Sequence, residues 1–346
     1  MKKITLNKIP SIYKNVNLAN EVNLDDNIPA QEGTFIVVQA LENEGLKDVL
    51  DYASGRLGKL VEGDIIAGVL GFRSAPIEFA GFVPEKVNVG DELYLLCESG
   101  LIGEISGIYE AWGKPMKVKI LGSIVTDQGD HMNLNEYALP KAEESKKKTP
   151  IIAFLATSMD SGKTTMACKI AHALTLQGKK VAAIKTTGVG YTQDLYKMKE
   201  YGASPVLDFV DMGIPSTCGV GGENIVALAE NLINTIEKTN PDVILMEFGD
   251  GIIGEYHVKD LLKHEPIKNQ IAFFLLAAND FSGVYGTQKL LEEMNLKIDL
   301  VTGPIANSRL GVDLVKKYFQ LDAESNQHEI PATTSLINKK VFGENV

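Results

Sequence analysis

The sequence predicts an α/β protein in which a small β-barrel-like N-terminal domain precedes a three-layer α/β/α domain with a mainly parallel sheet. Up to residue 140, short apolar segments are separated by glycine-containing turns. From residue 151 on, apolar runs alternate with helical patterns, which is typical of a parallel sheet covered by helices. Between them lies the charged, proline-bounded stretch PKAEESKKKTP. We therefore expect domains at residues 1–140 and 151–346 and an exposed linker at 141–150.

The bulk properties narrow the possible functions. A net charge of −11 and a pI near 5.1 argue against general nucleic-acid binding, which requires a basic face. The three cysteines contain no CxxC pair, so neither a disulfide framework nor structural zinc is expected. The sequence shows no signal-length apolar core and no membrane-length apolar run, so we expect a cytoplasmic protein that does not enter a membrane.

The first domain shows strand patterns and a recurring turn. Strands are expected at Thr34–Ala40, Ile65–Leu70 and Glu92–Leu96, and a short helical turn at Leu46–Ala53. A Gly-Asp pair follows a valine-bearing segment twice, at residues 63–64 and 90–91, and a strand follows each time. The recurrence suggests a weak internal duplication in a small barrel.

Few side chains of the first domain suggest chemistry. Arg56, Arg73 and Glu78 could line a ligand groove, but solvated charges on a barrel rim are the more common arrangement. The single tryptophan, Trp112, is expected to be a packing residue, and His131 is expected in a surface loop. We expect this domain to mediate assembly or to cover a site on the second domain.

The second domain begins with a strand, a tight loop and a helix. The apolar run Ile151–Leu155 predicts a strand buried on both faces, and helical spacing follows from Lys163 to Gln177. The loop between them ends in Ser-Gly-Lys-Thr-Thr. A loop that passes directly into a helix start directs several backbone N–H groups at one point, where the helix dipole also favours negative charge. This arrangement predicts a phosphate-binding loop.

Each residue type in the loop suits that chemistry. Gly162 allows close approach of a phosphate, Lys163 supplies a mobile positive charge, and the Thr164 hydroxyl is placed to ligate Mg²⁺. The strict GxxxxGK[ST] pattern has glycine where this chain has Thr157. The expected nucleotide-binding residues are Thr157, Ser158, Asp160, Ser161, Gly162, Lys163, Thr164 and Thr165, with Asn307 as a further candidate.

The remaining elements of the second domain follow from periodicity. The other strands are expected at Val181–Lys185, Val206–Phe209, Val243–Glu247, Ile271–Ala277 and Leu300–Thr302. The other helices are expected at Tyr191–Tyr201, Glu223–Glu237, Val258–Lys263, Gly286–Met294 and Gly311–Tyr318. Ligands of such sheets bind beyond the carboxyl ends of the strands, so the residues at those ends are the candidates for function.

Two strand ends carry charged residues. Lys185 ends the second strand and could bind an anionic substrate, and Asp194 beyond it could cap a helix or reach a metal. The run VILME ends in Glu247, in the form of a Walker B strand whose acid holds Mg²⁺; Asp250 is the second choice for that role. Cys218 lies in a glycine-rich loop and could be reactive, although an idle thiol is more common.

The loop ATSMDSGKTT resembles the GTDTxVGKT loop of dethiobiotin synthetase, with Ala156 in place of its first glycine and Ser158 in place of its aspartate. Lys185 falls where that family has a substrate-binding lysine, and Glu247 with Gly249 resembles its VEGAGG metal-binding strand end. The layout is also similar to the P-loop domain of molybdopterin-guanine dinucleotide accessory proteins and to D-glutamate N-acetyltransferase. The segment DFV, at residues 208–210, matches the last group. The resemblance covers about residues 150–310.

The resemblance implies a fold, a cofactor and several possible activities. The leading one is an ATP- and Mg²⁺-dependent enzyme that activates a small carboxylate or amino-acid-like substrate, or phosphorylates a small metabolite. In this reaction the expected catalytic residues are Lys163, Lys185 and Glu247. The residues expected at the metal are Thr164, Glu247 and Asp250. The alternatives are acyl transfer from acetyl-coenzyme A and a nucleotide-driven switch that serves a partner enzyme. In related folds an asparagine after a late strand reads the purine base, which makes Asn307 a candidate for that role or for a helix cap. A homodimer is expected, and no motif decides between adenine and guanine.

Overall fold

The computed structural model describes residues 2–344 and divides into two compact units. The first takes in the chain up to Pro140, together with Val189–Gln193 and Phe209–Gly219. The second takes in Lys141–Gly188, Asp194–Asp208 and the chain from Val220 on. Two short segments from within the predicted second domain therefore group with the first unit, and each unit is described by itself below.

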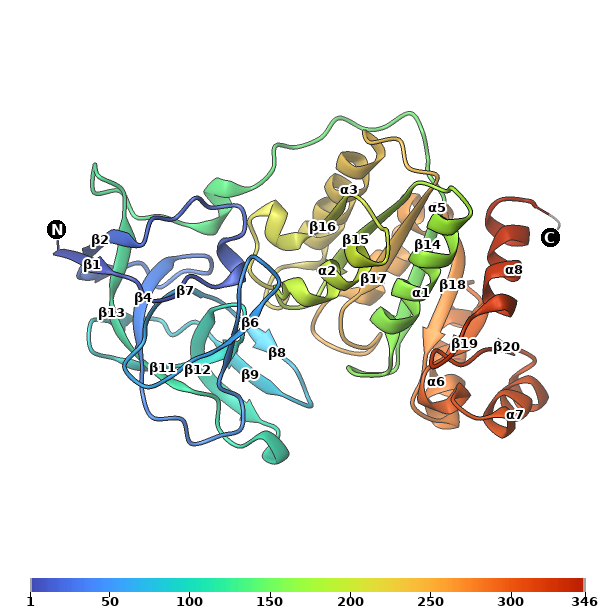
Figure 1. Ribbon diagram of the computed structural model, residues 1–346, viewed down its shortest axis with the longest axis horizontal. Coiled ribbons are helices and arrows are strands. Elements are labelled where there is room, and N and C mark those ends of the chain that lie inside the picture. The colour runs from blue at the N-terminus through green and yellow to red at the C-terminus, as the bar shows by residue number, and fades with distance from the viewer. Residues whose placement is uncertain (1, 345–346) are drawn as a thin grey trace. The chain divides into compact units, whose positions relative to one another are not determined.

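The first unit is built from short strands (Figure 1). They are β1 (Lys2–Thr5), β2 (Glu21–Asp25), β3 (Asn27–Ile28), β4 (Phe35–Ala40), β5 (Val49–Asp51), β6 (Leu57–Lys59), β7 (Ile65–Leu70), β8 (Arg73–Ser74), β9 (Phe79–Phe82), β10 (Val87–Asn88), β11 (Glu92–Cys97), β12 (Leu101–Ile108) and β13 (Lys117–Val125). Short 3-10 helices are η1 (Ser11–Tyr13), η2 (Glu110–Trp112), η3 (Leu134–Tyr137) and η4 (Phe209–Met212).

Five of these strands close on themselves. Strand β4 pairs with β13 and β7, β7 with β12, β12 with β11, and β11 with β13 again. Only the β7–β12 pair in this circuit is parallel. Buried aliphatic side chains from the closed sheet, among them Ile36, Val38 and Ile66, form one core. The small barrel predicted from the sequence is therefore confirmed.

The two Gly-Asp turns have the same geometry. The Asp64 carboxylate accepts a hydrogen bond from the N–H of Val61 (2.8 Å), and the Asp91 carboxylate accepts one from the N–H of Asn88 (2.7 Å). The preceding glycines have φ of 87° and 95°, in the left-handed region that favours glycine. The same device thus stabilises the start of β7 and of β11.

The helical turn predicted at Leu46–Ala53 is wrong, because β5 pairs there with β6. Asp51 at the end of β5 is fully buried. Its carboxylate accepts hydrogen bonds from the Ser11 hydroxyl (2.6 Å) and from the N–H (3.0 Å) and hydroxyl (2.7 Å) of Thr192. It also accepts one from the side-chain amide of Gln193 (2.8 Å). These long-range bonds outweigh local helix propensity, and they hold residues 189–193 in the first unit.

Of the three charges predicted on a barrel rim, Arg56 is exposed as expected, whereas Arg73 and Glu78 are largely buried. Arg73 is only 3% exposed, and its guanidinium contacts the Glu78 carboxylate and the Leu96 carbonyl. Lys47 completes the group by pairing with Glu78 and, at 3.0 Å, with Glu98. Two acids thus balance two bases, so the solvated rim expected for Arg73 and Glu78 is incorrect and the group serves as a structural network.

The second unit holds a seven-stranded parallel sheet in the order β16-β15-β17-β14-β18-β19-β20. Its strands are β14 (Ile151–Ala156), β15 (Val181–Thr187), β16 (Val206–Asp208), β17 (Val243–Phe248), β18 (Ile271–Ala277), β19 (Leu300–Thr302) and β20 (Asp322–Ala323). Its helices are α1 (Lys163–Leu176), α2 (Thr192–Glu200), α3 (Gly222–Glu237), α4 (Val258–Lys263), α5 (Glu265–Gln270), α6 (Phe281–Glu293), α7 (Arg309–Phe319) and α8 (Pro331–Val341), with η5 (Pro304–Ala306) before α7.

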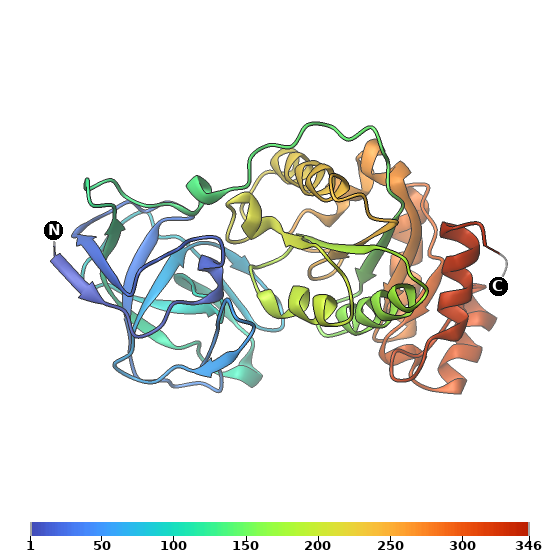
Figure 2. The same ribbon diagram turned by 45° about the horizontal axis from the view of Figure 1, so that its top comes forward.

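The helices cover both faces of this sheet, as the fold class predicts. Side chains of α1, α2 and α8 pack with one face of the strands in a single core that includes Phe154, Ile170 and Ile337. Figure 2 shows α3, in gold, on the opposite side of the sheet from α1. The predicted strands and helices are present, but α6 begins at Phe281, five residues before the predicted start. The Asp280 carboxylate caps it by accepting from the N–H of Gly283 (2.7 Å).

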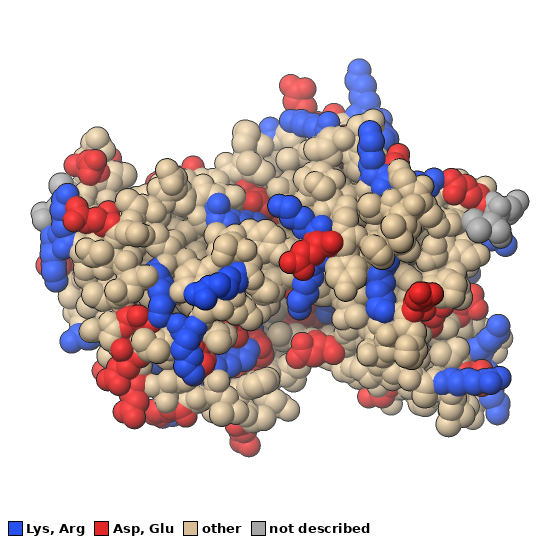
Figure 3. All heavy atoms as spheres, viewed as in Figure 1, with Lys and Arg blue, Asp and Glu red and all other residues tan. Residues whose placement is uncertain are grey.

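Surface charges of both signs are interspersed over much of the face drawn in Figure 3. Several form ion pairs between exposed side chains, such as Lys114–Glu44 at 2.8 Å. Exposed pairs of this kind contribute little to stability because water screens them. Among residues 2–344, no helix is long and apolar enough to cross a bilayer.

Candidate active site

The loop between β14 and α1 is held in shape by the end of β18. The N–H of Thr157 donates to the Ala277 carbonyl (3.1 Å), and the Thr157 hydroxyl accepts from the N–H of Asn279 (3.3 Å). The Asn279 side-chain amide donates to the Ser158 hydroxyl (2.7 Å). Threonine thus replaces the expected glycine at position 157 because its hydroxyl fixes the loop. Asn279 lies two residues beyond the strand predicted at Ile271–Ala277, but the sequence did not reveal this role.

The last turn of the loop requires glycine. Gly162 has φ of 92°, and a Cβ at this position would lie 2.2 Å from the side-chain nitrogen of Asn326. That nitrogen donates to the Gly162 carbonyl (3.2 Å), so Asn326 closes over the loop. The hydroxyl of buried Ser161 donates to the Ser158 carbonyl (2.5 Å). The side chains of Asp160 and Thr165 are exposed. Asn326 lies in a segment where periodicity gave no signal.

Behind the loop, α1 presents two residues to a cluster of charges. Lys163 is 7% exposed, and its amine donates to the main-chain carbonyl of Asp250 (3.2 Å). The Thr164 hydroxyl donates to Oε1 of Glu247 (3.0 Å) and lies 3.4 Å from Oδ1 of Asp194. The loop, the end of β17 and the start of α2 therefore meet at Thr164.

Strand order brings the charges of the cluster side by side. In the register of the parallel sheet, Lys185 on β15 is opposite Asp208 on β16 and Glu247 on β17. Residues opposite each other on neighbouring strands point to the same face. The Lys185 amine donates to Asp194 (2.7 Å) in a pair whose lysine is only 7% exposed at the side chain. The site therefore alternates acid and base across three adjacent strands.

The environment changes the proton affinity of these groups. Burial, and after it the negative charge of nearby Asp194, raises the pKa of Glu247 from 4.5 to about 7. The positive charges of Lys185 and Lys163 oppose this rise. Among the described residues, Oε2 of Glu247 has no hydrogen-bond partner although it is buried. Burial lowers the pKa of Lys163, which the surrounding acids partly offset. A half-satisfied buried carboxylate beside a lysine is a common feature of functional sites.

Asp194 and Lys185 form the most strongly paired part of the cluster. Burial alone would raise the pKa of Asp194, but the Lys185 charge and hydrogen bond outweigh it and lower that pKa. Burial acts to lower the pKa of Lys185, but Asp194 and then Glu247 raise it well above its ordinary value. Both groups are therefore ionised at neutral pH, and each neutralises the other.

The other predicted residues lie apart from this cluster or play a different part in it. Asp250 has φ of 63°, and its main-chain carbonyl accepts the hydrogen bond from Lys163. Asn307 is exposed at the end of η5, and its side-chain oxygen accepts from the Ser325 hydroxyl (3.0 Å). Cys218 is buried in the segment that groups with the first unit. Among the described residues, no group of three or more His, Cys, Asp and Glu side chains could hold a metal by itself.

Residues 152–319 match the protein-family model described as CbiA, the CobQ/CobB/MinD/ParA nucleotide binding domain. The match begins in β14, includes the loop and every charged residue of the cluster, and ends with α7. The segment is a P-loop nucleotide-binding domain. The match is to this wide group and does not single out the dethiobiotin synthetase resemblance seen in the sequence.

Solved structures similar to this chain include a signal recognition particle receptor, a tyrosine kinase domain and a nucleotide-binding protein. The signal recognition particle receptor FtsY from Elizabethkingia anophelis is 16% identical, with 61% of this chain and 75% of that chain covered and a TM-score of 0.35. The kinase domain of the tyrosine kinase ETK from Escherichia coli is 15% identical (48% and 71% covered, TM-score 0.35). A nucleotide-binding protein in complex with ADP from Archaeoglobus fulgidus is 13% identical (56% and 86% covered, TM-score 0.37). At such TM-scores these similarities add nothing to the family match. The comparison with curated proteins found no match.

Proposed function

We propose that the P-loop domain catalyses Mg²⁺-dependent transfer of the terminal phosphoryl group of a nucleoside triphosphate. The observation that carries the proposal is the meeting of Lys163, Thr164 and Glu247 at the start of α1, with the Thr164 hydroxyl 3.0 Å from the Glu247 carboxylate. Phosphoryl transfer depends on positioning and on neutralising charge, and these residues supply both.

The residues present fit a magnesium ion. The buried Oε2 atom of Glu247 lacks a hydrogen-bond partner among residues 2–344, and the Thr164 hydroxyl lies beside the same carboxylate. Asp194 adds a second carboxylate 3.4 Å from that hydroxyl. Mg²⁺ is usually held by one or two carboxylates together with phosphate oxygens and water, so a complete protein cage is not needed. When bound, the ion would neutralise charge on the phosphates. Thr164 and Glu247, with Asp194, would hold it.

The chain's own groups supply the remaining stabilisation. The first N–H groups of α1 are free of intrahelical partners and favour a phosphate at the helix start. Lys163 is held at that point by its bond to the Asp250 carbonyl, and a phosphate oxygen can replace that carbonyl as its acceptor. Low exposure strengthens these interactions because water does not screen them.

The geometry suggests a changed role for Lys185. A lysine that orients an anionic substrate needs an uncommitted charge, whereas Lys185 is 5% exposed and bonded to Asp194. We therefore propose that Lys185 positions Asp194 beside Thr164. The acceptor of the phosphoryl group, a small carboxylate in our leading hypothesis, would then be recognised by other residues.

A nucleotide-driven switch is the second candidate. It is supported by the family description, which includes MinD and ParA, and by the absence of an uncommitted charge at Lys185. In this mode water would accept the phosphoryl group, and turnover would be slow until a partner is added. The comparisons give no support to the acetyl-coenzyme A alternative.

The test is turnover with ATP and with GTP, each with and without Mg²⁺, for wild type, Lys163→Ala and the control Lys317→Ala. Lys317 is an exposed lysine on α7. We expect Lys163→Ala to lower kcat/KM by about 10³-fold, since loss of one electrostatic stabiliser costs several kcal/mol. The control should equal wild type. Full Mg²⁺-dependent turnover by Lys163→Ala would overturn the assignment of the loop.

A thermal-shift panel separates the candidates. A Mg²⁺-dependent rise in Tm with ATP or GTP supports nucleotide binding, and a rise with acetyl-coenzyme A alone would favour acyl transfer. Turnover stimulated by a small carboxylate supports the leading hypothesis. Slow hydrolysis that no small carboxylate stimulates supports the switch.

A further inference from the structure

One side chain holds the last turn of the phosphate-binding loop from outside the loop. Asn326 lies between β20 and α8 and is only 3% exposed. Its side-chain nitrogen donates to the Gly162 carbonyl (3.2 Å), which also accepts from the N–H of Met166 (3.2 Å) in the first turn of α1. A Cβ on Gly162 would lie 2.2 Å from that nitrogen, so the glycine leaves room for Asn326. Two donors therefore hold one carbonyl oxygen.

The direction of this carbonyl determines where the neighbouring N–H points. The Gly162 carbonyl and the Lys163 N–H belong to one planar trans peptide, so they point in opposite directions. Because the carbonyl is directed along α1 toward Met166, the Lys163 N–H is directed out of the helix start, where a phosphate is favoured. A second hydrogen bond on the carbonyl also polarises the peptide, which makes that N–H a stronger donor.

Asn326 is itself held in one orientation. The side-chain nitrogen of Gln327 donates to the side-chain oxygen of Asn326 (2.8 Å), so the nitrogen of Asn326 is the end that faces Gly162. The N–H of Gln327 donates to the Ser325 hydroxyl (3.1 Å), and that hydroxyl donates to the side-chain oxygen of Asn307 (3.0 Å). A side-chain amide with a partner at both ends has one preferred orientation.

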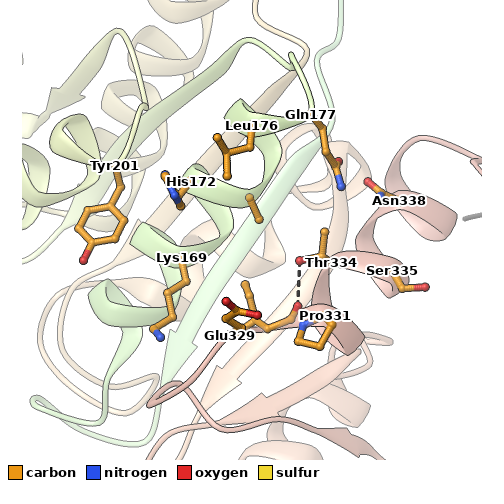
Figure 4. Close-up of a pocket in the computed structure, with 12 residues that line it drawn as sticks. Lys169, His172, Leu176, Gln177, Tyr201, Glu329, Pro331, Thr334, Ser335 and Asn338 are labelled. Carbon is orange, nitrogen blue, oxygen red and sulfur yellow. Dashed lines mark hydrogen bonds between the residues drawn. The ribbon is translucent and has the colours of Figure 1, made fainter.

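The chain on either side of Asn326 is anchored to the rest of the unit. The Thr302 hydroxyl on β19 donates to the Glu324 carbonyl (2.8 Å), and the Lys169 amine on α1 donates to the His328 carbonyl (2.6 Å). Figure 4 shows the Lys169 side chain extending from α1 toward the segment that leads into α8. All of these residues belong to the second unit. The position of Asn326 is therefore fixed before any ligand binds.

We propose that Asn326 is a positioning residue of the nucleotide site. Its side-chain nitrogen fixes the Gly162–Lys163 peptide so that the Lys163 N–H donates to a phosphate oxygen of the bound nucleotide. The inference rests on the proposed function, because it takes the phosphates to lie at the start of α1. It adds a contribution from residues 324–328, which supply no charge and no metal ligand. The role requires a hydrogen-bond donor at position 326, and a side chain of the same shape without a donor does not replace it.

Two substitutions of Asn326 separate the donor from the shape. Asn326→Leu removes the donor and adds no charge. Asn326→Asp keeps the oxygen that accepts from Gln327, but its other oxygen can donate to Gly162 only when the carboxyl group is protonated. An aspartate carboxyl ordinarily has a pKa of about 3.9, and burial beside a carbonyl and a bound phosphate raises it. Lowering the pH therefore restores the donor in Asn326→Asp.

The test is calorimetry on the full chain with the Mg²⁺ complexes of non-hydrolysable ATP and GTP analogues, at pH 8 and pH 5.5. We expect Asn326→Leu to bind about tenfold more weakly than wild type at both pH values, because one hydrogen bond is lost. Relative to wild type, Asn326→Asp should bind more weakly than Asn326→Leu at pH 8, because of its charge, and more tightly than Asn326→Leu at pH 5.5. The control Asn295→Asp adds the same charge at an exposed position and should equal wild type.

The pH dependence distinguishes positioning from a structural role. If Asn326 only stabilised the fold, both variants would lower the Tm and a lower pH would restore no affinity to Asn326→Asp. Affinity of Asn326→Leu within about twofold of wild type would overturn the proposal. Affinity of Asn326→Asp no higher than that of Asn326→Leu at pH 5.5 would also overturn it.

The failure of this proposal can be told apart from failure of the proposed function. If wild type binds neither nucleotide complex, both are overturned. If wild type binds a complex and Lys163→Ala does not, while both Asn326 variants equal wild type, only the role of Asn326 is overturned.

Discussion

Replacing Glu247 by glutamine should stabilise the ligand-free protein, and the effect should grow with pH. Glu247 is 2% exposed, and burial together with Asp194 raises its pKa from 4.5 to about 7. The folded state therefore binds a proton more tightly than the unfolded state does. Between pH 4.5 and pH 7 the unfolding free energy falls as pH rises, because the folded state keeps this carboxyl group protonated while the unfolded state has released the proton.

The size of the effect follows from the two pKa values. A difference of one pKa unit is worth about 1.4 kcal/mol, so the raised pKa of Glu247 costs about 3 kcal/mol of stability at pH 8 and about 1 kcal/mol at pH 5, relative to low pH where both states are protonated. Glutamine keeps the shape and can accept from Thr164, but it has no charge to bury. We expect Glu247→Gln to raise the Tm by about 5 °C or more at pH 8 and by much less at pH 5.

The assay is urea or thermal unfolding of both proteins at the two pH values, with the exposed Glu255→Gln as control. The control should change stability by less than about 0.5 kcal/mol at either pH. The variant should also lose the Mg²⁺-dependent rise in Tm with nucleotide, because it lacks the carboxylate proposed to hold the ion. A Glu247→Gln protein that is less stable than wild type at pH 8, or a gain that does not depend on pH, would refute this account of the site.

Three further predictions concern the loop, the cluster and the barrel. Gly162→Ala should lower the unfolding free energy by about 2 kcal/mol and weaken nucleotide binding, because φ is 92° and a Cβ would lie 2.2 Å from the side-chain nitrogen of Asn326. Denaturant unfolding tests the loss of stability, and calorimetry tests the loss of nucleotide affinity. Asp194→Asn should lower the pKa of Glu247 by removing a neighbouring negative charge, and a pH titration of Mg²⁺-nucleotide affinity should shift to lower pH. Asp91→Ala should cost about 1 kcal/mol in urea unfolding, since its carboxylate accepts a backbone N–H in the turn. Asp64→Ala should cost more, because that carboxylate accepts the equivalent bond and also pairs with Lys8, and a smaller cost than for Asp91→Ala would contradict this account.

Local sequence was enough to predict the parts of the fold that local physics determines. The apolar runs that became β18 and β19 and the helix α4 have the predicted bounds, because side-chain periodicity is a direct consequence of strand and helix geometry. The helix start at Lys163 and the acid at the end of β17 could be found in the same way, since strand ends of a parallel sheet share one edge. The barrel could be predicted from its turns.

Other features depend on residues far apart in the chain. The β5 strand replaces a predicted helical turn because Asp51 bonds to Ser11 and Thr192, which no local pattern can show. The support that Asn279 and Asn326 give to the phosphate-binding loop likewise comes from segments more than a hundred residues away. The spacing of residues along the sequence cannot predict contacts between segments that are this far apart in the chain.

The same division holds for the chemistry. The sequence alone identified Lys163, Thr164, Lys185 and Glu247 as charged or hydroxyl-bearing groups at strand and helix ends. Only the strand order of the sheet decided that Lys185 would face Glu247 and be neutralised by Asp194. Burial then decided that Glu247 would hold its proton up to about pH 7. Residue type determines what a side chain can do, whereas neighbours and exclusion of water determine its charge, and these exist only in the folded chain.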